Sequence, residues 1–138
     1  MAYSFIYSRW YALKKRLSSI LAIYWRYRPN RLYLLIVVII QILLWVFAYQ
    51  TYATLGNDLL VAHYNVDFGI DSIASPKQIF NIPLLAVAIL LVNFITLSFF
   101  TKRLNFHFLA NAAGITGIMV QLLAALALMS LYLINFLA

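Results

Sequence analysis

The sequence predicts an all-α membrane protein in which an amphipathic helix precedes three transmembrane helices. Two observations lead to this fold class. Hydrophobic residues make up 66% of the 138 residues and charged residues 9%, against about 45–50% and about 25% in soluble domains. The chain also contains three long stretches without a charged residue. A soluble fold of this size has no interior large enough to hide so much apolar surface.

The uncharged stretches run from Leu32 to Asn57, from Gln78 to Thr101 and from Leu104 to Ala138. They contain 26, 24 and 35 residues, and a membrane-spanning helix needs about 20. A helix pairs its own backbone groups, as the lipid interior requires. We therefore expect a membrane domain over residues 32–138, with an outer loop at 55–80 and spans at about 32–54, 81–101 and 108–136.

The basic residues predict the orientation of the spans. With the N-terminus inside, the inner side carries nine basic residues, including Lys102 and Arg103. The outer side carries Lys77 and all three acidic residues. Because basic residues concentrate on the cytoplasmic side of membrane proteins, the N-terminus is expected in the cytoplasm and the C-terminus outside.

Residues 1–31 predict a basic amphipathic helix that lies in the cytoplasmic membrane interface and ends at Arg28-Pro29. Apolar side chains recur every three or four residues along one face: Ile6, Trp10, Leu13, Leu17, Ile20 and Tyr24. The residues expected at the membrane surface are Arg9, Trp10, Lys14, Lys15 and Arg16. Cations interleaved with aromatic and aliphatic residues favour anionic lipid headgroups over nucleic acid. The same stripe also fits docking on a partner's soluble domain.

Each span carries one amide side chain near its centre, namely Gln41, Asn93 and Gln121. Since an unpaired amide in hydrocarbon is costly, these side chains are expected to face protein and to form a hydrogen-bonded cluster between the helices. Such a cluster fits interhelical packing, and it also fits the lining of a permeation path. The third span adds a strip of small residues that lets helices approach closely: Ala110, Ala113, Gly114, Gly117, Ala124 and Ala125. Its partner is a span of this chain, a second copy or another subunit.

Few residues offer catalytic or metal-binding chemistry. The chain has no cysteine, which excludes disulfides and thiolate sites. His63 and His107 are expected on opposite sides of the bilayer, so they cannot ligate one haem. On a continuous helix, His63, Asp67 and Asp71 would share one face and resemble a metal or general-base site. Gly69 interrupts that segment, however, and we predict no metal, no cofactor and no enzymatic activity.

The outer loop reads His63-Tyr64-Asn65-Val66-Asp67-Phe68-Gly69-Ile70-Asp71, and Gln78-Ile79-Phe80-Asn81-Ile82-Pro83-Leu84 follows it. This pattern resembles small uncharacterised three-span membrane proteins of genome-reduced candidate-phylum bacteria. The resemblance covers about residues 32–136. It implies a bacterial cell membrane, the same three-span layout and no known activity, with His63, Asn65, Asp67 and Asp71 in the outer loop.

Small size, the absence of intramembrane charge and the small-residue strip favour a non-catalytic accessory or scaffolding role. The chain would then be a subunit of a larger membrane assembly, in contact with lipid and with other membrane subunits or copies of itself. The alternative is a small homo-oligomeric channel lined by the three midplane amides. A transporter is disfavoured because transport chemistry usually needs an ionisable group within the membrane.

Overall fold

The computed structural model describes residues 2–56, 58–65, 69–100 and 105–136, and gives the backbone alone at 2–6, 13, 16, 17, 20, 63–65 and 69–71. Its elements follow one another in the order α1 (Ala2–Arg26), α2 (Arg28–Leu55), β1 (Leu60–Asn65), β2 (Gly69–Ala74), the 3-10 helix η1 (Pro76–Phe80), α3 (Asn81–Phe99) and α4 (Phe106–Phe136).

Three helical stretches are long and apolar enough to cross a membrane: Arg28–Leu55, Pro76–Phe99 and Phe106–Phe136. Each of them overlaps one of the predicted spans, and the predicted all-α, three-span fold class is confirmed. The second stretch begins earlier than expected, because η1 leads directly into α3. The chain is thus built as a multi-pass membrane protein.

Pro29 begins a helix rather than ending one. α1 stops at Arg26, and Tyr27 follows it in an extended conformation. α2 then starts at Arg28 and carries Pro29 in its first turn, where the missing N–H would have had no intrahelical acceptor. The predicted boundary at residue 31 is therefore displaced, because residues 28–31 belong to the first spanning helix.

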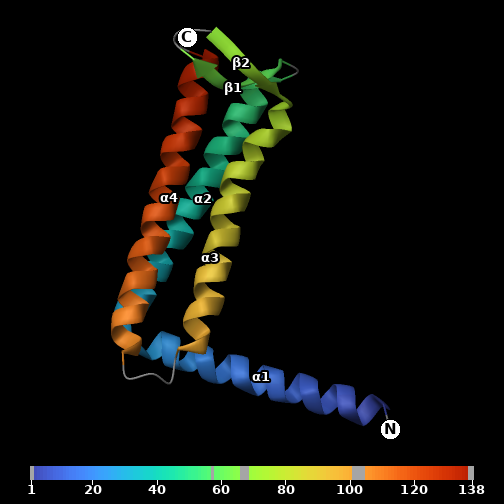
Figure 1. The fold of residues 1–138 in the computed structure, drawn as a ribbon, viewed down its shortest axis with the longest axis vertical. Helices are drawn as coiled ribbons and strands as arrows, with labels where there is room; N and C mark the ends of the chain where they lie inside the picture. The colour runs from blue at the N-terminus through green and yellow to red at the C-terminus, as the bar shows by residue number, and fades with distance from the viewer. Residues whose placement is uncertain (1, 57, 66–68, 101–104, 137–138) are drawn as a thin grey trace.

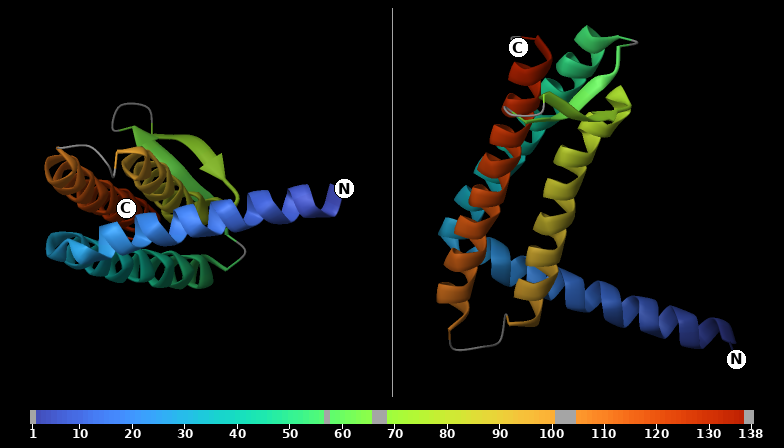
Figure 2. Two further views of the ribbon diagram at one scale, coloured as in Figure 1. Left: turned by 90° about the horizontal axis from the view of Figure 1, so that it is seen from below. Right: turned by 45° about the horizontal axis from the view of Figure 1, so that its top comes forward.

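α4 is the central helix of the bundle. α2 and α3 each pack along α4 and contact each other less. Figure 1 shows α3 running antiparallel to both α2 and α4. α1 leaves one end of the bundle sideways, and the β1–β2 hairpin covers the other end, where the C-terminus also lies (Figures 1 and 2). The two extramembrane elements are therefore separated by the full length of the bundle.

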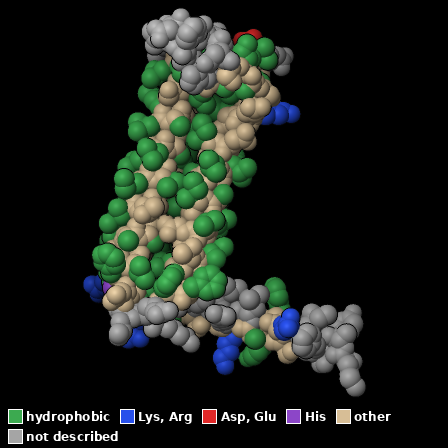
Figure 3. Space-filling model, viewed as in Figure 1, with side chains coloured by type: hydrophobic (Ala, Val, Ile, Leu, Met, Phe, Trp, Pro, Cys, Tyr) green, Lys and Arg blue, Asp and Glu red, His purple; other side chains and the backbone are tan. Residues whose placement is uncertain are grey.

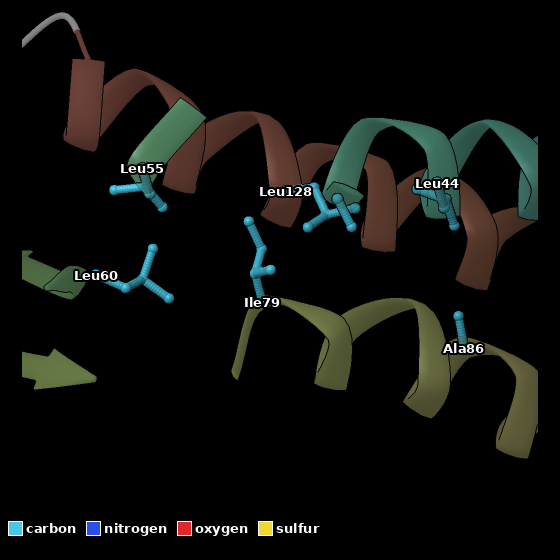
Figure 4. Close-up of a cluster of buried hydrophobic side chains, with 7 residues drawn as sticks. Leu44, Leu55, Leu60, Ile79, Ala86 and Leu128 are labelled. Carbon is cyan, nitrogen blue, oxygen red and sulfur yellow. The ribbon is translucent and has the colours of Figure 1, made fainter. Parts of the chain in front are cut away.

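The main core lies in the half of the bundle next to the hairpin. Figure 4 shows buried side chains from five elements pointing toward one another: Leu44, Leu55, Leu60, Ile79, Ala86 and Leu128. Because Leu60 belongs to β1 and Ile79 to η1, the hairpin and the 3-10 helix share the core of the spanning helices. A second, smaller cluster near α1 contains Leu97, Phe106 and Ala110.

The outer segment holds an antiparallel hairpin that the sequence prediction did not include. β1 and β2 pair from Leu60 with Ala74 to Asn65 with Gly69, and the register skips Ala62 and Asp71. The continuous helix that would bring His63 and Asp71 onto one face is not present, and Asp67 lies outside the described residues. His63 lies on β1 and Asp71 on β2, so these two residues do not follow one another along a single helix.

Candidate functional site

Two of the three midplane amides meet in the bundle interior. Gln121 donates from Nε2 to Oε1 of Gln41 at 2.7 Å. Gln41 in turn donates from its own Nε2 to the carbonyl oxygen of Pro83 at 3.0 Å. This short chain of hydrogen bonds joins α4 to α2 and α2 to α3. Gln121 is fully buried, so the hydrogen bond between the two amides lies in the interior of the bundle.

The pair leaves one polar atom unused. Among the described residues, no donor reaches Oε1 of Gln121. A buried acceptor without a partner lowers stability because it has lost its water and gained nothing in exchange. Gln121 therefore carries one favourable hydrogen bond and one unpaired oxygen, whereas Gln41 uses both ends of its amide.

Asn93 forms a separate contact. It donates from Nδ2 to the backbone carbonyl of Ala113 at 2.8 Å and so joins α3 to α4. The structure thus brings Gln41 and Gln121 together and holds Asn93 in a hydrogen bond of its own. All three amides bond to other helices of the same chain, as hydrogen-bonded polar groups do in membrane bundles.

The small-residue strip of α4 contacts other spanning helices of the same chain. Gly114 and Gly117 are buried, and the ring of Tyr33 from α2 lies directly against Gly114, where a Cβ atom would overlap it. At Gly117 a Cβ atom would lie 3.2 Å from a methyl group of Leu90 on α3. Of the three partners that the sequence allowed for this strip, the structure shows spans of the same chain.

Side chains from three elements fix the junction between α1 and α2, which we call the elbow (Tyr24, Tyr27, Asn30, Tyr33 and Asn111). Fully buried Asn30 donates from Nδ2 to the carbonyl of Tyr24 at 3.2 Å and so satisfies one of the last carbonyls of α1. The hydroxyls of Tyr27 and Tyr33 both donate to Oδ1 of Asn111 on α4, at 3.2 and 3.4 Å.

Ring contacts reinforce the elbow. The ring of Tyr24 meets Phe94 of α3 edge-on at 5.5 Å, and Tyr27 lies 4.4 Å from the imidazole of His107 on α4. Burial raises the pKa of the Tyr24 hydroxyl above its ordinary value. The end of α1 is therefore held by all three spanning helices.

A single amide adds hydrogen bonds between the bundle and the hairpin, whose Leu60 is already buried in the main core. Asn135, in the last turn of α4, accepts a hydrogen bond from the Val61 amide at 2.9 Å and donates to the Val61 carbonyl at 3.0 Å. It also donates to the carbonyl of Leu131 at 2.8 Å. The side chain thus pairs both backbone groups of one residue of β1.

The other predicted surface residues fall into two groups. Arg9, Trp10, Lys14 and Lys15 are exposed on α1, and Trp10 is 65% exposed. His63 and Asn65 belong to β1 and Asp71 to β2, while Asp67 and the side chains of Arg16, His63, Asn65 and Asp71 lie outside the described residues. Figure 3 shows basic side chains along α1 and the adjoining end of the bundle, and apolar side chains between the two ends.

An apolar groove lies between α2 and α3, next to the elbow. It encloses about 400 Å³. α2 and α3 form its walls, α4 contributes Ala113 and Gly114, and the end of α1 contributes Leu21, Tyr24 and Trp25. A second apolar groove of about 570 Å³ lies between α2 and α4.

In the described part of the chain, no three histidine, cysteine, aspartate or glutamate side chains lie close enough together to hold a metal ion. Comparison with protein-family models, curated proteins and solved structures returned no match. The function must therefore be argued from the elbow, the buried amides and the exposed α1 themselves.

The residues that sequence reasoning missed are Asn30, Asn111 and Asn135. The available signal was their position, because each is a lone amide within two turns of the end of a long apolar helix. Such residues find partners in the extramembrane elements next to them, and the sequence alone does not reveal which partners these are.

Proposed function

We propose that this chain is a non-catalytic accessory or scaffolding protein of a cell membrane, and a subunit of a larger membrane assembly. The observation that carries the proposal is α1. This helix has 25 residues, contacts the bundle at its end through Leu21, Tyr24 and Trp25, and exposes the large side chains of Tyr7, Trp10 and Tyr11. Exposed aromatic residues beside cations fit a membrane surface and a binding partner there.

The charge distribution supports a cytoplasmic location for α1. Nine of the ten basic residues fall in α1, the first turn of α2 or the segment between α3 and α4, and all three acidic residues fall between α2 and η1. The positive-inside rule then favours a cytoplasmic α1 and an external hairpin. For a bacterial protein, as the outer-loop pattern implies, the membrane would be the inner one.

Burial of the midplane amides favours a scaffold over a channel. Gln121 is fully buried and bonded to Gln41, and Asn93 is bonded to Ala113. Their hydrogen bonds hold the helices of one protomer together, so these amides present no continuous polar path. The channel lined by Gln41, Asn93 and Gln121 remains an alternative proposal with less support.

Purification from native membranes in mild detergent, with mass spectrometry of proteins recovered in fixed stoichiometry, tests the scaffold. We expect a heteromeric complex that Trp10→Glu on the apolar stripe disrupts and that Ala12→Glu on the opposite face leaves intact. Recovery of homo-oligomers alone, together with solute flux through reconstituted liposomes that Asn93→Leu abolishes, would contradict the scaffold and support the channel.

Reporter fusions test the orientation separately. A reporter that is active only outside the cytoplasm should be active when fused after Ala138 and silent when fused after Arg103. The reverse pattern would place α1 on the outer surface and would contradict the cytoplasmic scaffold.

A further inference from the structure

We propose that the groove between α2 and α3 holds an acyl chain of an anionic phospholipid, whose headgroup binds Lys14 of α1. The proposal deepens the scaffold function and rests on the placement of α1 at the bilayer surface. One lipid of the leaflet next to α1 is then a specific ligand of this chain.

The groove has the shape and chemistry of a site for a hydrocarbon chain. Its volume of about 400 Å³ falls within the range of small-molecule sites, roughly 300–1,000 Å³. Buried Val37 and Gly114 form its floor, while exposed Leu34 and Leu91 form its rims. Because these rims belong to the spanning helices, the groove opens sideways toward lipid.

The groove offers few groups to a polar ligand. Gln41 and Asn93 line it, and one N–H of each amide already donates, to Pro83 and to Ala113. Every other side chain that contributes to the groove is apolar or aromatic. A hydrocarbon chain is the ligand that matches such an apolar surface.

α1 continues the groove along the bilayer surface. Seen from below, α1 crosses the bundle between α2 and α3 and extends beyond it (Figure 2). Leu21 of α1 contributes to the groove, and Lys14 precedes Leu21 by seven residues. Two turns of helix place Lys14 on the same face, about 10 Å away along the axis.

The position of Lys14 selects an anionic headgroup. An ammonium on the membrane-facing side of an interfacial helix reaches for the phosphate level of the bilayer. Residues 1–57 contain no acidic residue, so no carboxylate of this segment competes for it. Lys15 is equally exposed but points about 100° away around the helix, which makes it a matched control for Lys14.

Native mass spectrometry of the full chain tests the proposal. The protein is purified in mild detergent, stripped of lipid and incubated with palmitoyl-oleoyl phosphatidylglycerol or the corresponding phosphatidylcholine. We expect one retained phosphatidylglycerol per protomer, in preference to phosphatidylcholine. Lys14→Gln should lower that preference about five-fold, the equivalent of roughly 1 kcal/mol for one basic residue at an anionic surface. Lys15→Gln should leave it unchanged.

A second matched pair tests the groove. Leu91 and Val92 are both exposed neighbours on α3, but only Leu91 lines the groove. Leu91→Trp should remove most of the bound lipid and Val92→Trp should not, with both variants checked by thermal unfolding. If Leu91→Trp fails to fold, Leu34→Trp takes its place on the opposite rim.

Equal lipid retention by Leu91→Trp and Val92→Trp would overturn the proposal, as would equal behaviour of Lys14→Gln and Lys15→Gln. Release of a protein partner by Leu91→Trp, with lipid retention unchanged, would assign the groove to another subunit's helix and would also overturn it. In either case, partner binding that depends on Trp10 but not on Ala12 would show that the scaffold function stands without the lipid site.

Discussion

The two ends of the bundle hold their extramembrane elements in different ways. At one end, the last turn of α1 and the adjoining Tyr27 contact all three spanning helices. The ring of Tyr24 meets Phe94 of α3 and its carbonyl accepts a hydrogen bond from Asn30 of α2, while Tyr27 contacts α4. At the other end, the side chain of Asn135 binds the backbone of Val61. The direction of α1 is therefore coupled to the packing of the bundle, whereas the hairpin combines the burial of Leu60 in the main core with hydrogen bonds from one side chain.

Under the proposed scaffold role, this difference concerns the end that would meet a partner. A platform for a partner must hold one direction, and at the α1 end the contacts that could fix it come from α2, α3 and α4. Substitutions at each end of the bundle, and at the buried amides between the ends, test this difference.

The largest effect is expected at Gly114. In Gly114→Ala the new methyl group overlaps the ring of Tyr33, which must move and lose its hydrogen bond to Asn111. Overpacking of this kind costs about 1–3 kcal/mol in free energy of unfolding. Unfolding in detergent by a titrated denaturant measures it.

Gly117→Ala is the control for that substitution. The nearest atom is a terminal methyl group of Leu90 at 3.2 Å, which can yield by a small rotation, so the cost should stay below about 1 kcal/mol. Equal losses at the two glycines would show that the ring of Tyr33 does not fix the seam next to α1.

A smaller effect is expected at the paired amides. Gln41→Leu removes two hydrogen bonds and leaves Nε2 of Gln121 unpaired, at a cost of about 1 kcal/mol. Gln121→Leu removes one hydrogen bond together with an unpaired buried oxygen, and should cost clearly less. The double variant should be less than additive, because the two residues share one bond.

Thermal unfolding of the three variants in detergent measures these differences. A larger loss for Gln121→Leu than for Gln41→Leu would mean that Oε1 of Gln121 has a partner after all. The amides would then belong to a larger polar path, as the channel hypothesis requires.

How much of this arrangement the sequence predicts depends on the solvent that each segment meets. Lipid demands a helix at every uncharged stretch, so hydropathy alone locates α2, α3 and α4. The same rule does not apply to the outer segment, where water can pair with free backbone groups. There, the four-residue spacing of His63, Asp67 and Asp71 is compatible with a helical face and does not reveal the hairpin of β1 and β2.

The sequence also does not reveal which residues the buried side chains contact. Helical spacing places Gly114 and Gln121 on one face of α4, but it cannot show that the face meets Tyr33 and Gln41 of the same chain. The elbow depends on the hydrogen bond between Tyr33 and Asn111, which are 78 positions apart and meet only when α2 and α4 pack.

The smallest effect is expected at the hairpin end. Asn135→Leu removes the hydrogen bonds to Val61, but this end lies beside water that can replace them, so we expect a loss of about 0.5 kcal/mol. The loss should be local. Hydrogen exchange should quicken at the Val61 amide and remain unchanged at the centre of α2. Faster exchange throughout the bundle would show that the hairpin is not independent.

The claim that the elbow fixes the direction of α1 is tested most directly by a distance between α1 and the bundle. The chain has no cysteine, so spin labels at Ala12→Cys on α1 and Ala127→Cys on α4 report one distance distribution in lipid nanodiscs. We expect a narrow distribution that Tyr27→Phe combined with Asn111→Leu broadens and that Asn135→Leu leaves unchanged. A distribution that is already broad with the elbow intact would contradict the account, because α1 would then have no fixed direction for a partner to bind.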